Sequence, residues 1–236
     1  MTLYLYAIID KPPPADARIG NGIARKPLSV VRVGRAFVVV EPAEGCDPTP
    51  HAIVAHDRVV RRVARISPAV LPLRFGSTTE SRAEVQALLL PLAAPIKRAF
   101  ERVRGAVQFT LRVTGRRRSA EPVHVPAVGP GTRWLAERMA AQRVSEIACI
   151  TEATRPWVRE IRSQRHDLLR SARAEASGSG HRKGPREPFA TVYHLVSRDS
   201  VRAWRLAFRR SMANLPPDVC VTMTGPWPAY AFAELA

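Results

Sequence analysis

The sequence predicts an α+β protein with an N-terminal mixed α+β domain, followed by a smaller C-terminal α+β domain that includes helical segments. Three observations lead to this prediction. Several short runs alternate apolar and polar residues, as strands with one buried face do. Other stretches carry apolar residues at helical spacing. The two kinds of segment occur in mixed order, which is expected of helices packed on one face of a sheet.

The N-terminal half is predicted to contain a strand, a two-stranded hairpin, a helix, a strand, a longer helix and a further strand. Their ranges are 3–9, 28–33 with 36–40, 51–66, 70–75, 79–104 and 106–113. Gly34-Arg35 separates the strands of the hairpin as a two-residue turn. Pro91 and Pro95 each remove a backbone hydrogen bond, so we expect a bend in the longer helix, which Gly105 closes.

The C-terminal half is predicted to contain two helices, a strand, a third helix and a last strand. Their ranges are 132–149, 154–173, 189–196, 198–213 and 218–224. Residues 115–131 have the composition of a linker or long loop, and residues 175–188 that of a mobile loop. Gly225-Pro226 is expected to end the last strand, because proline lacks a donor. The predicted domains are therefore 1–115 and 116–236.

The composition is that of an ordinary globular protein, with 46% hydrophobic and 24% charged residues among 236. The three cysteines lie far apart with no C-x-x-C pair, which predicts neither a disulfide framework nor a thiolate zinc site and fits a reducing cytoplasm. No basic segment precedes the first apolar stretch, so no signal peptide is expected. The uncharged run Val85–Ile96 is too short to span a bilayer. We therefore expect a soluble cytoplasmic protein.

The formal net charge is +17, and this excess of positive charge is spread along the whole chain. Only Lys11, Lys26, Lys97 and Lys183 are lysines, so arginine dominates the 37 basic residues. Codon bias in a GC-rich genome explains such a ratio, and selection for a polyanionic partner is the alternative. No helix-turn-helix pattern, zinc-finger spacing or RNA-binding sheet motif is present. We expect non-specific nucleic-acid binding at low salt and no specific nucleic-acid partner.

Catalytic and metal-binding motifs are not found in the sequence. It contains no H-E-x-x-H, no G-x-S-x-G and no G-x-x-x-x-G-K motif. His51 and His56 are five residues apart, which does not place them on one helical face as a metal pair requires. The prediction is a protein that is not an enzyme and that has no catalytic, cofactor-binding or metal-binding residues.

Four arginines and one phenylalanine are candidate contact residues. Arg74 in the strand 70–75 either clamps a carboxylate of a partner or forms an internal ion pair, and Phe75 is expected to pack. Within the predicted helix 154–173, arginines and a histidine recur at steps of three and four. They are Arg155, Arg159, Arg162, His166, Arg170 and Arg173. This stripe is either a docking face for an acidic partner or a solvated outer face.

The C-terminal segment places three aromatic residues, Trp227, Tyr230 and Phe232, within six positions. Termini fray unless something holds them, and aromatics of this size are worth ordering only if they dock. Docking that closes the small sheet is one interpretation, and a contact patch for a hydrophobic partner is the other. We expect Trp227 to lock the tail and Phe232 to be the contact residue.

Five segments of the chain form a recognisable series: the N-terminal Leu-Tyr-Leu-Tyr strand, the His56-containing helix, Val70–Gly76, Gly131–Leu135 and Thr224–Pro228. In register, they resemble the gas vesicle accessory proteins of the F/L type (GvpF/GvpL). They occur in the order found in the family and span nearly the whole chain.

The resemblance implies a modified ferredoxin-like C-terminal domain and a role in gas vesicle nucleation or assembly. It implies binding to the small apolar shell subunit and to other vesicle proteins, in the cytoplasm at the vesicle, without a cofactor or a membrane. A shell protein with a gas-facing apolar surface must be kept from aggregating before it polymerises, which calls for apolar docking sites on a highly charged body. The alternative is a basic module that binds polyanions or nucleic acid and does so at physiological salt.

Overall fold

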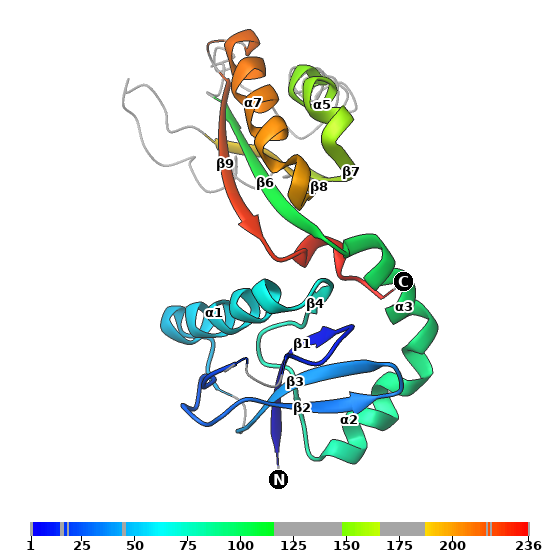
Figure 1. The fold of residues 1–236 in the computed structure, drawn as a ribbon. Coiled ribbons are helices and arrows are strands. Elements are labelled where there is room, and N and C mark those ends of the chain that lie inside the picture. The colour runs from blue at the N-terminus through cyan, green and yellow to red at the C-terminus, as the bar shows by residue number, and fades with distance from the viewer. Residues whose placement is uncertain are drawn as a thin grey trace, which may run out of the picture. The chain divides into compact units, whose positions relative to one another are not determined.

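The computed structural model describes residues 2–14, 17, 19–43, 46–115, 148–165, 187–215, 217 and 219–235 (Figure 1). Contacts divide the chain into two compact units. Unit 1 comprises Met1–Gln108 together with Pro226–Ala236, and unit 2 comprises Phe109–Gly225. The domain boundary between 115 and 116 stays a prediction, because residues 116–147 lie outside the described residues.

Unit 1 is built on a five-stranded sheet. Its strands are β1 (Leu3–Ile9), β2 (Ser29–Val33), β3 (Ala36–Pro42), β4 (Val70–Pro72) and β5 (Thr78–Thr79). The order is β2-β3-β1-β4, β5 also pairs with β1, and all of these pairs are antiparallel. Every residue of β1 is buried, because neighbouring strands flank both of its edges and helices cover its faces. Gly34, with φ 58°, allows the tight turn of the predicted β2–β3 hairpin.

Helix α1 (Pro50–Ile66) begins where the sequence predicts a helix start. The Thr49 hydroxyl accepts a hydrogen bond from the Ala52 backbone N–H, and Pro50 occupies the first turn, where no intrahelical partner for an N–H exists. The helix packs its apolar side against the sheet. The cluster contains Tyr4, Tyr6, Ala7, Ile9, Leu28, Val39, Val59, Val60, Val63 and Val70.

The long helix expected over 79–104 is divided into three pieces: α2 (Arg82–Leu89), the 3-10 turn η1 (Leu90–Leu92) and α3 (Ala93–Val103). It starts late, because Thr78–Thr79 pair with β1 and the Ser81 hydroxyl then caps α2. Pro91 lies in η1, so the predicted break occurs there. Pro95 lies in the first turn of α3, where a missing N–H interrupts no helical hydrogen bond, so it does not bend the helix.

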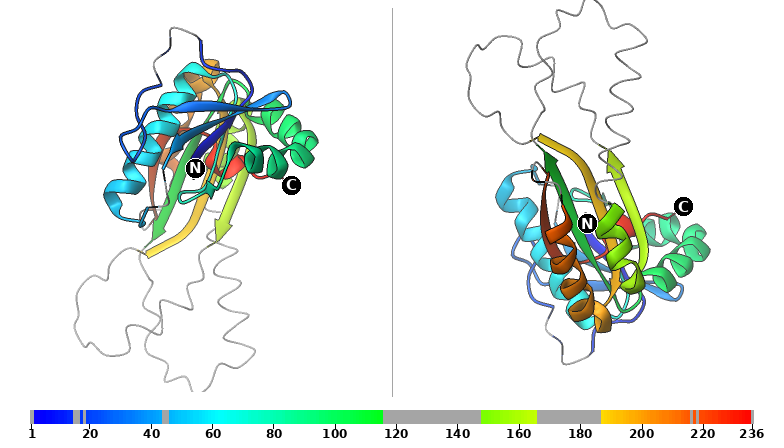
Figure 2. Two further views of the ribbon diagram at one scale, coloured as in Figure 1. Left: turned by 90° about the horizontal axis from the view of Figure 1, so that it is seen from below. Right: turned by 90° about the horizontal axis from the view of Figure 1, so that it is seen from above.

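Unit 2 contains a four-stranded sheet with helices against it. Its elements run β6 (Ala106–Gly115), α5 (Ala148–Thr154), η2 (Arg155–Trp157), β7 (Val158–Arg165), β8 (Glu187–Ser197), η3 (Arg198–Ser200), α7 (Val201–Ser211), η4 (Met212–Asn214) and β9 (Val219–Trp227). The strand order is β7-β8-β6-β9. Helices α5 and α7 lie side by side on one face of the sheet (Figure 2). The α+β class is confirmed, whereas the ferredoxin-like detail stays a prediction.

An aromatic stack forms the centre of unit 2. The Trp204 ring of α7 stacks on Phe109 of β6 at 4.1 Å between centroids and on Phe208 at 5.6 Å. The indole N–H of Trp204 donates to Nδ1 of His194 at 3.2 Å, and both residues are completely buried. Stacked aromatic rings therefore form the core of unit 2, and the one polar atom of the Trp204 ring has a hydrogen-bond acceptor.

The prediction of a helix over 154–173 was wrong over residues 158–165. Residues 158–165 form strand β7, which pairs with β8 in antiparallel register from Val158↔Val196 to Arg165↔Ala190. This pairing with a distant segment overrides the helical spacing of the arginines. Glu160 and Arg162 form an ion pair at 2.8 Å, as residues two apart on one face of a strand can. Residues 166–173 lie outside the described residues.

The last strand also differs from its prediction. β9 continues through Gly225-Pro226 to Trp227, so these two residues do not end it. β9 is the edge strand next to β6, and an edge position tolerates proline, because no strand on the outer side needs its N–H. Gly225 takes φ 124°, which a residue with a side chain rarely adopts. The predicted helix 132–149 falls almost wholly outside the described residues, and α5 continues past its expected end.

Candidate functional site

The turn that follows β4 lies over a cluster of aromatic rings in unit 1. Tyr4 and Tyr6 of β1, His56 of α1 and Phe75 of the turn contact one another at centroid distances of 4.9–6.1 Å. The Phe75 ring is half-buried against Tyr4 and His56. Gly76 turns the chain with φ 84°. Side chains of β1 and α1 therefore hold the Leu-Arg-Phe-Gly segment in place.

Hydrogen bonds determine the proton positions in this cluster. The Leu73 carbonyl can only accept, so Nε2 of His56, 3.3 Å away, carries the proton. Nδ1 of His56 then accepts from the Tyr4 hydroxyl at 3.1 Å, and that hydroxyl accepts from the Gly76 backbone N–H at 2.9 Å. Burial lowers the pKa of His56 and raises that of Tyr4. Both groups are neutral at pH 7, and they serve to position the turn.

A buried carboxylate next to this cluster holds the loop before β2. Glu41 accepts from the Tyr6 hydroxyl at 2.6 Å and from the backbone N–H groups of Ala24 at 3.2 Å and Lys26 at 2.8 Å. Burial is the main cause that raises the pKa of Tyr6, and the Glu41 hydrogen bond adds to it. A Cβ atom at Gly22 would overlap the Glu41 carboxylate and the Tyr6 hydroxyl, so only glycine fits there. Sequence patterns did not reveal this network, since its members are separated by loops.

The C-terminal segment folds back on α1 through a chain of polar contacts. The Tyr230 hydroxyl donates to Oδ1 of Asp57 at 2.8 Å, and Asp57 forms an ion pair with Arg61 at 2.5 Å. The Arg61 guanidinium lies 3.9 Å over the Trp227 ring. Burial of the Tyr230 hydroxyl and its hydrogen bond to Asp57 raise the pKa of Tyr230. Trp227 and Tyr230 thus engage one face of α1.

Phe232 is completely buried. Its carbonyl accepts from Nε and Nη2 of Arg102 on α3, at 3.1 and 2.7 Å, and the Ala231 N–H donates to Oε1 of Gln108 at 2.8 Å. The expectation that Phe232 is a partner contact is therefore corrected, because its ring is inside the core of unit 1. All three aromatics of the tail pack or form contacts within unit 1, with Tyr230 the most exposed of them, and the expectation that Trp227 locks the tail stays a prediction.

The largest exposed apolar side chains of unit 1 lie on α2 with η1 and on the first turns of α1. Leu88 and Leu90 are 55% and 56% exposed, and Ile53 and Val54 of α1 are each 46% exposed. Residues 86–95, which we call the α2–η1 surface, contain no charged residue and none that is fully buried. Arg82 and Glu84 precede this surface and Lys97 follows it, so the apolar stretch is bounded by charge.

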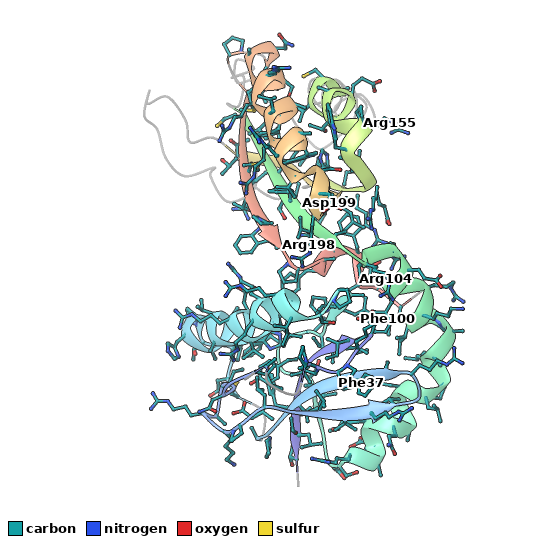
Figure 3. All side chains as sticks on the ribbon, viewed as in Figure 1. Phe37, Phe100, Arg104, Arg155, Arg198 and Asp199 are labelled. Atoms are coloured by element: carbon teal, nitrogen blue, oxygen red, sulfur yellow. The ribbon has the colours of Figure 1, made fainter. Side chains whose placement is uncertain are left out.

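The four candidate arginines lie on three different segments of the chain. Arg74 is exposed on its turn, and the described residues offer it no ion pair. Arg155, labelled in Figure 3, is exposed in η2. Arg159 donates to the Ser197 hydroxyl at 3.2 Å, while Arg162 pairs with Glu160. Arg159 lies where the register of β7 shifts between Val158 and Glu160, and Arg162 pairs with Glu160 on one face of the strand, so the predicted helical stripe does not exist in β7.

No group of three or more His, Cys, Asp or Glu side chains that could hold a metal ion is found among the described residues. No helix in the described ranges is long and apolar enough to cross a membrane.

Comparison with known proteins identifies the family. The family model of the gas vesicle synthesis protein GvpL/GvpF matches residues 2–234. The chain belongs to the GvpL/GvpF family. The resemblance seen in the sequence is thereby confirmed, and the chain has a role in the gas vesicle. No match is found among the curated proteins.

Two solved structures of the GvpL/GvpF family share the fold. The gas vesicle protein GvpF from Anabaena sp. PCC7120 has a TM-score of 0.75 and 14% identity, with coverage of 100% of this chain and 97% of that one. GvpF from Microcystis aeruginosa has a TM-score of 0.76 and 13% identity, with coverage of 99% of both chains. At this identity the likeness establishes the fold.

Proposed function

We propose that this GvpL/GvpF protein binds the small apolar shell subunit of the gas vesicle through the α2–η1 surface during nucleation or assembly. The observation that carries the proposal is the exposed, uncharged stretch of residues 86–95 on a chain of net charge +17. Contiguous apolar surface is unusual on a monomeric protein and is typical of interaction sites. Other vesicle proteins complete the set of partners, with no specific nucleic acid, no membrane and no cofactor, and the protein acts by binding rather than by catalysis.

The local structure suits such a contact. Leu88 and Leu90 belong to successive short helical segments, and the Gln86 side chain donates to the Arg32 carbonyl at 3.1 Å. This bond ties α2 to β2, so the surface is held in place before a partner arrives. A preorganised apolar surface loses little side-chain entropy on binding. The charged residues on both sides keep the protein itself in solution.

The test is a pair of matched double variants. Leu88→Ser with Leu90→Ser removes the two most exposed leucines of the surface, and Ile53→Ser with Val54→Ser makes an equal change on α1 at similar exposure. We expect the first variant to lose co-purification with the shell subunit by at least about tenfold, because central apolar anchors carry most of the binding energy. The second should bind like the unmodified protein.

Thermal melting of both variants controls for folding, and exposed substitutions are expected to change stability by only about 0.5 kcal/mol. Equal binding by the two variants would show that the α2–η1 surface is not the docking site. Equal loss in both variants would indicate non-specific apolar adhesion instead.

A further inference from the structure

Helix α7 of unit 2 carries a basic face at true helical spacing. On its buried side, Trp204, Phe208 and Ser211 pack inward. Its opposite side is exposed and holds Arg202, Leu206, Arg209 and Arg210. Arg202 and Leu206 are four apart, and Leu206 is followed three residues later by Arg209, so these side chains are neighbours on the helix surface.

The arginines of this face are available to a partner. Arg202, Arg209 and Arg210 are exposed, and within the described part of the chain none of them forms an ion pair. The acidic residues on the elements nearest to them are Asp199, labelled at the start of α7 in Figure 3, and Glu152 of α5. Two acidic side chains leave this face with a clear positive excess.

Arg205 differs from the other arginines of α7 because it is not exposed. Its guanidinium lies 5.4 Å from the Phe109 ring, and the side chain is half-buried. Arg205 therefore belongs to the core of unit 2 and is excluded from the binding face.

The exposed Leu206 separates this face from an ordinary solvated one. It is 50% exposed and has Arg202 and Arg209 on one side and Arg210 on the other. A leucine offers no charge and no hydrogen bond to a phosphate, and phosphate neutralisation supplies most of the non-specific affinity for nucleic acid. A protein partner uses both, since an apolar anchor surrounded by charge complementarity is a common design of a specific interface.

We propose that the exposed face of α7 docks an acidic amphipathic helix of a protein partner, with Leu206 as the apolar anchor and Arg202, Arg209 and Arg210 as charge partners. This site is on a different unit from the α2–η1 surface and does not depend on the shell-subunit proposal. The partner helix carries carboxylates on both sides of an apolar stripe, so that each guanidinium meets an oxygen acceptor.

The experiment uses the full chain and a synthetic helical peptide with glutamates flanking a leucine stripe, at about 0.15 M salt, where diffuse charge is screened. A scrambled peptide of the same composition is the first control. Arg202→Glu with Arg209→Glu is expected to lower affinity for the helical peptide at least tenfold. Leu206→Ser, which leaves the charge unchanged, is expected to lower it about fivefold, the scale of one partly buried apolar side chain.

A charge-matched control separates this face from the overall charge. Arg58→Glu with Arg98→Glu changes the net charge by the same amount at exposed arginines of unit 1 and should alter affinity less than twofold. Equal loss in both double variants, or an unchanged affinity in Leu206→Ser, would overturn the proposal. So would tighter binding of a mixed-sequence oligonucleotide that depends on Arg202 and Arg209, because the face would then be a polyanion site.

Discussion

Replacement of Phe232 by alanine tests whether the C-terminal segment belongs to the core of unit 1. The Phe232 ring is fully buried, and its carbonyl is held by Arg102. Truncation of a buried phenylalanine costs about 3–5 kcal/mol, out of a total of about 5–15 kcal/mol for a domain. In a unit of this size each kcal/mol lowers the melting temperature by about 4 °C. We therefore expect a drop of roughly 12–20 °C for unit 1.

Calorimetry on the full chain is the suitable assay, because two units can melt in separate transitions. Tyr230→Phe is the control: it removes only the hydrogen bond to Asp57 and leaves the ring, at a cost of about 1 kcal/mol. Its melting temperature should fall by about 4 °C. If Phe232→Ala melts within about 3 °C of the unmodified protein, the buried ring contributes almost nothing and the reasoning is refuted.

Three further predictions concern single residues. Trp227→Ala should destabilise unit 1 less than Phe232→Ala, because its ring is half-buried and its contact with Arg61 contributes about 0.5–1 kcal/mol; an equal or larger drop in melting temperature would contradict this. Burial lowers the pKa of His194 to about 4, so the unfolded chain binds the extra proton first as the pH falls below about 6.5. Unit 2 should be fully stable above that pH and lose about 3 kcal/mol by pH 4, and His194→Gln should flatten the curve in acid titrations of unfolding. Gly22→Ala should cost about 1–3 kcal/mol in urea unfolding, because its Cβ collides with the buried Glu41 carboxylate, while Ala24→Ser at an exposed position should be neutral.

The elements of unit 1 were predictable because their signals are local. The alternation in residues 3–9 and the helical spacing of apolar residues in 51–66 act within a few residues, and β1 and α1 form as those signals indicate. The contacts of the candidate site are not local. Tyr6 and Glu41 are 35 residues apart, and Tyr230 and Asp57 are 173 apart. Contacts between residues so far apart in the sequence cannot be predicted from periodicity along the chain.

The error over residues 158–165 has a physical cause. In a chain with so many arginines, spacings of three and four arise by coincidence, and they suggested a helical stripe where β7 pairs with β8. Pro156, and the β-branched Val158 and Ile161, favoured a short turn and a strand. The apolar side of α7, with Trp204 and Phe208, was the better indication of a helix, since it also explains what is buried.

The assignment of Pro226–Ala236 to unit 1 has a consequence for biosynthesis. Unit 1 is discontinuous in sequence, with unit 2 inserted between its two pieces. During translation, Met1–Gln108 emerges long before Pro226–Ala236, so unit 1 lacks its final segment while unit 2 is being synthesised. Until residues such as Phe232 leave the ribosome, the apolar surface that they cover stays open to chaperones. The last step in the folding of unit 1 therefore waits for the synthesis of residues 226–236.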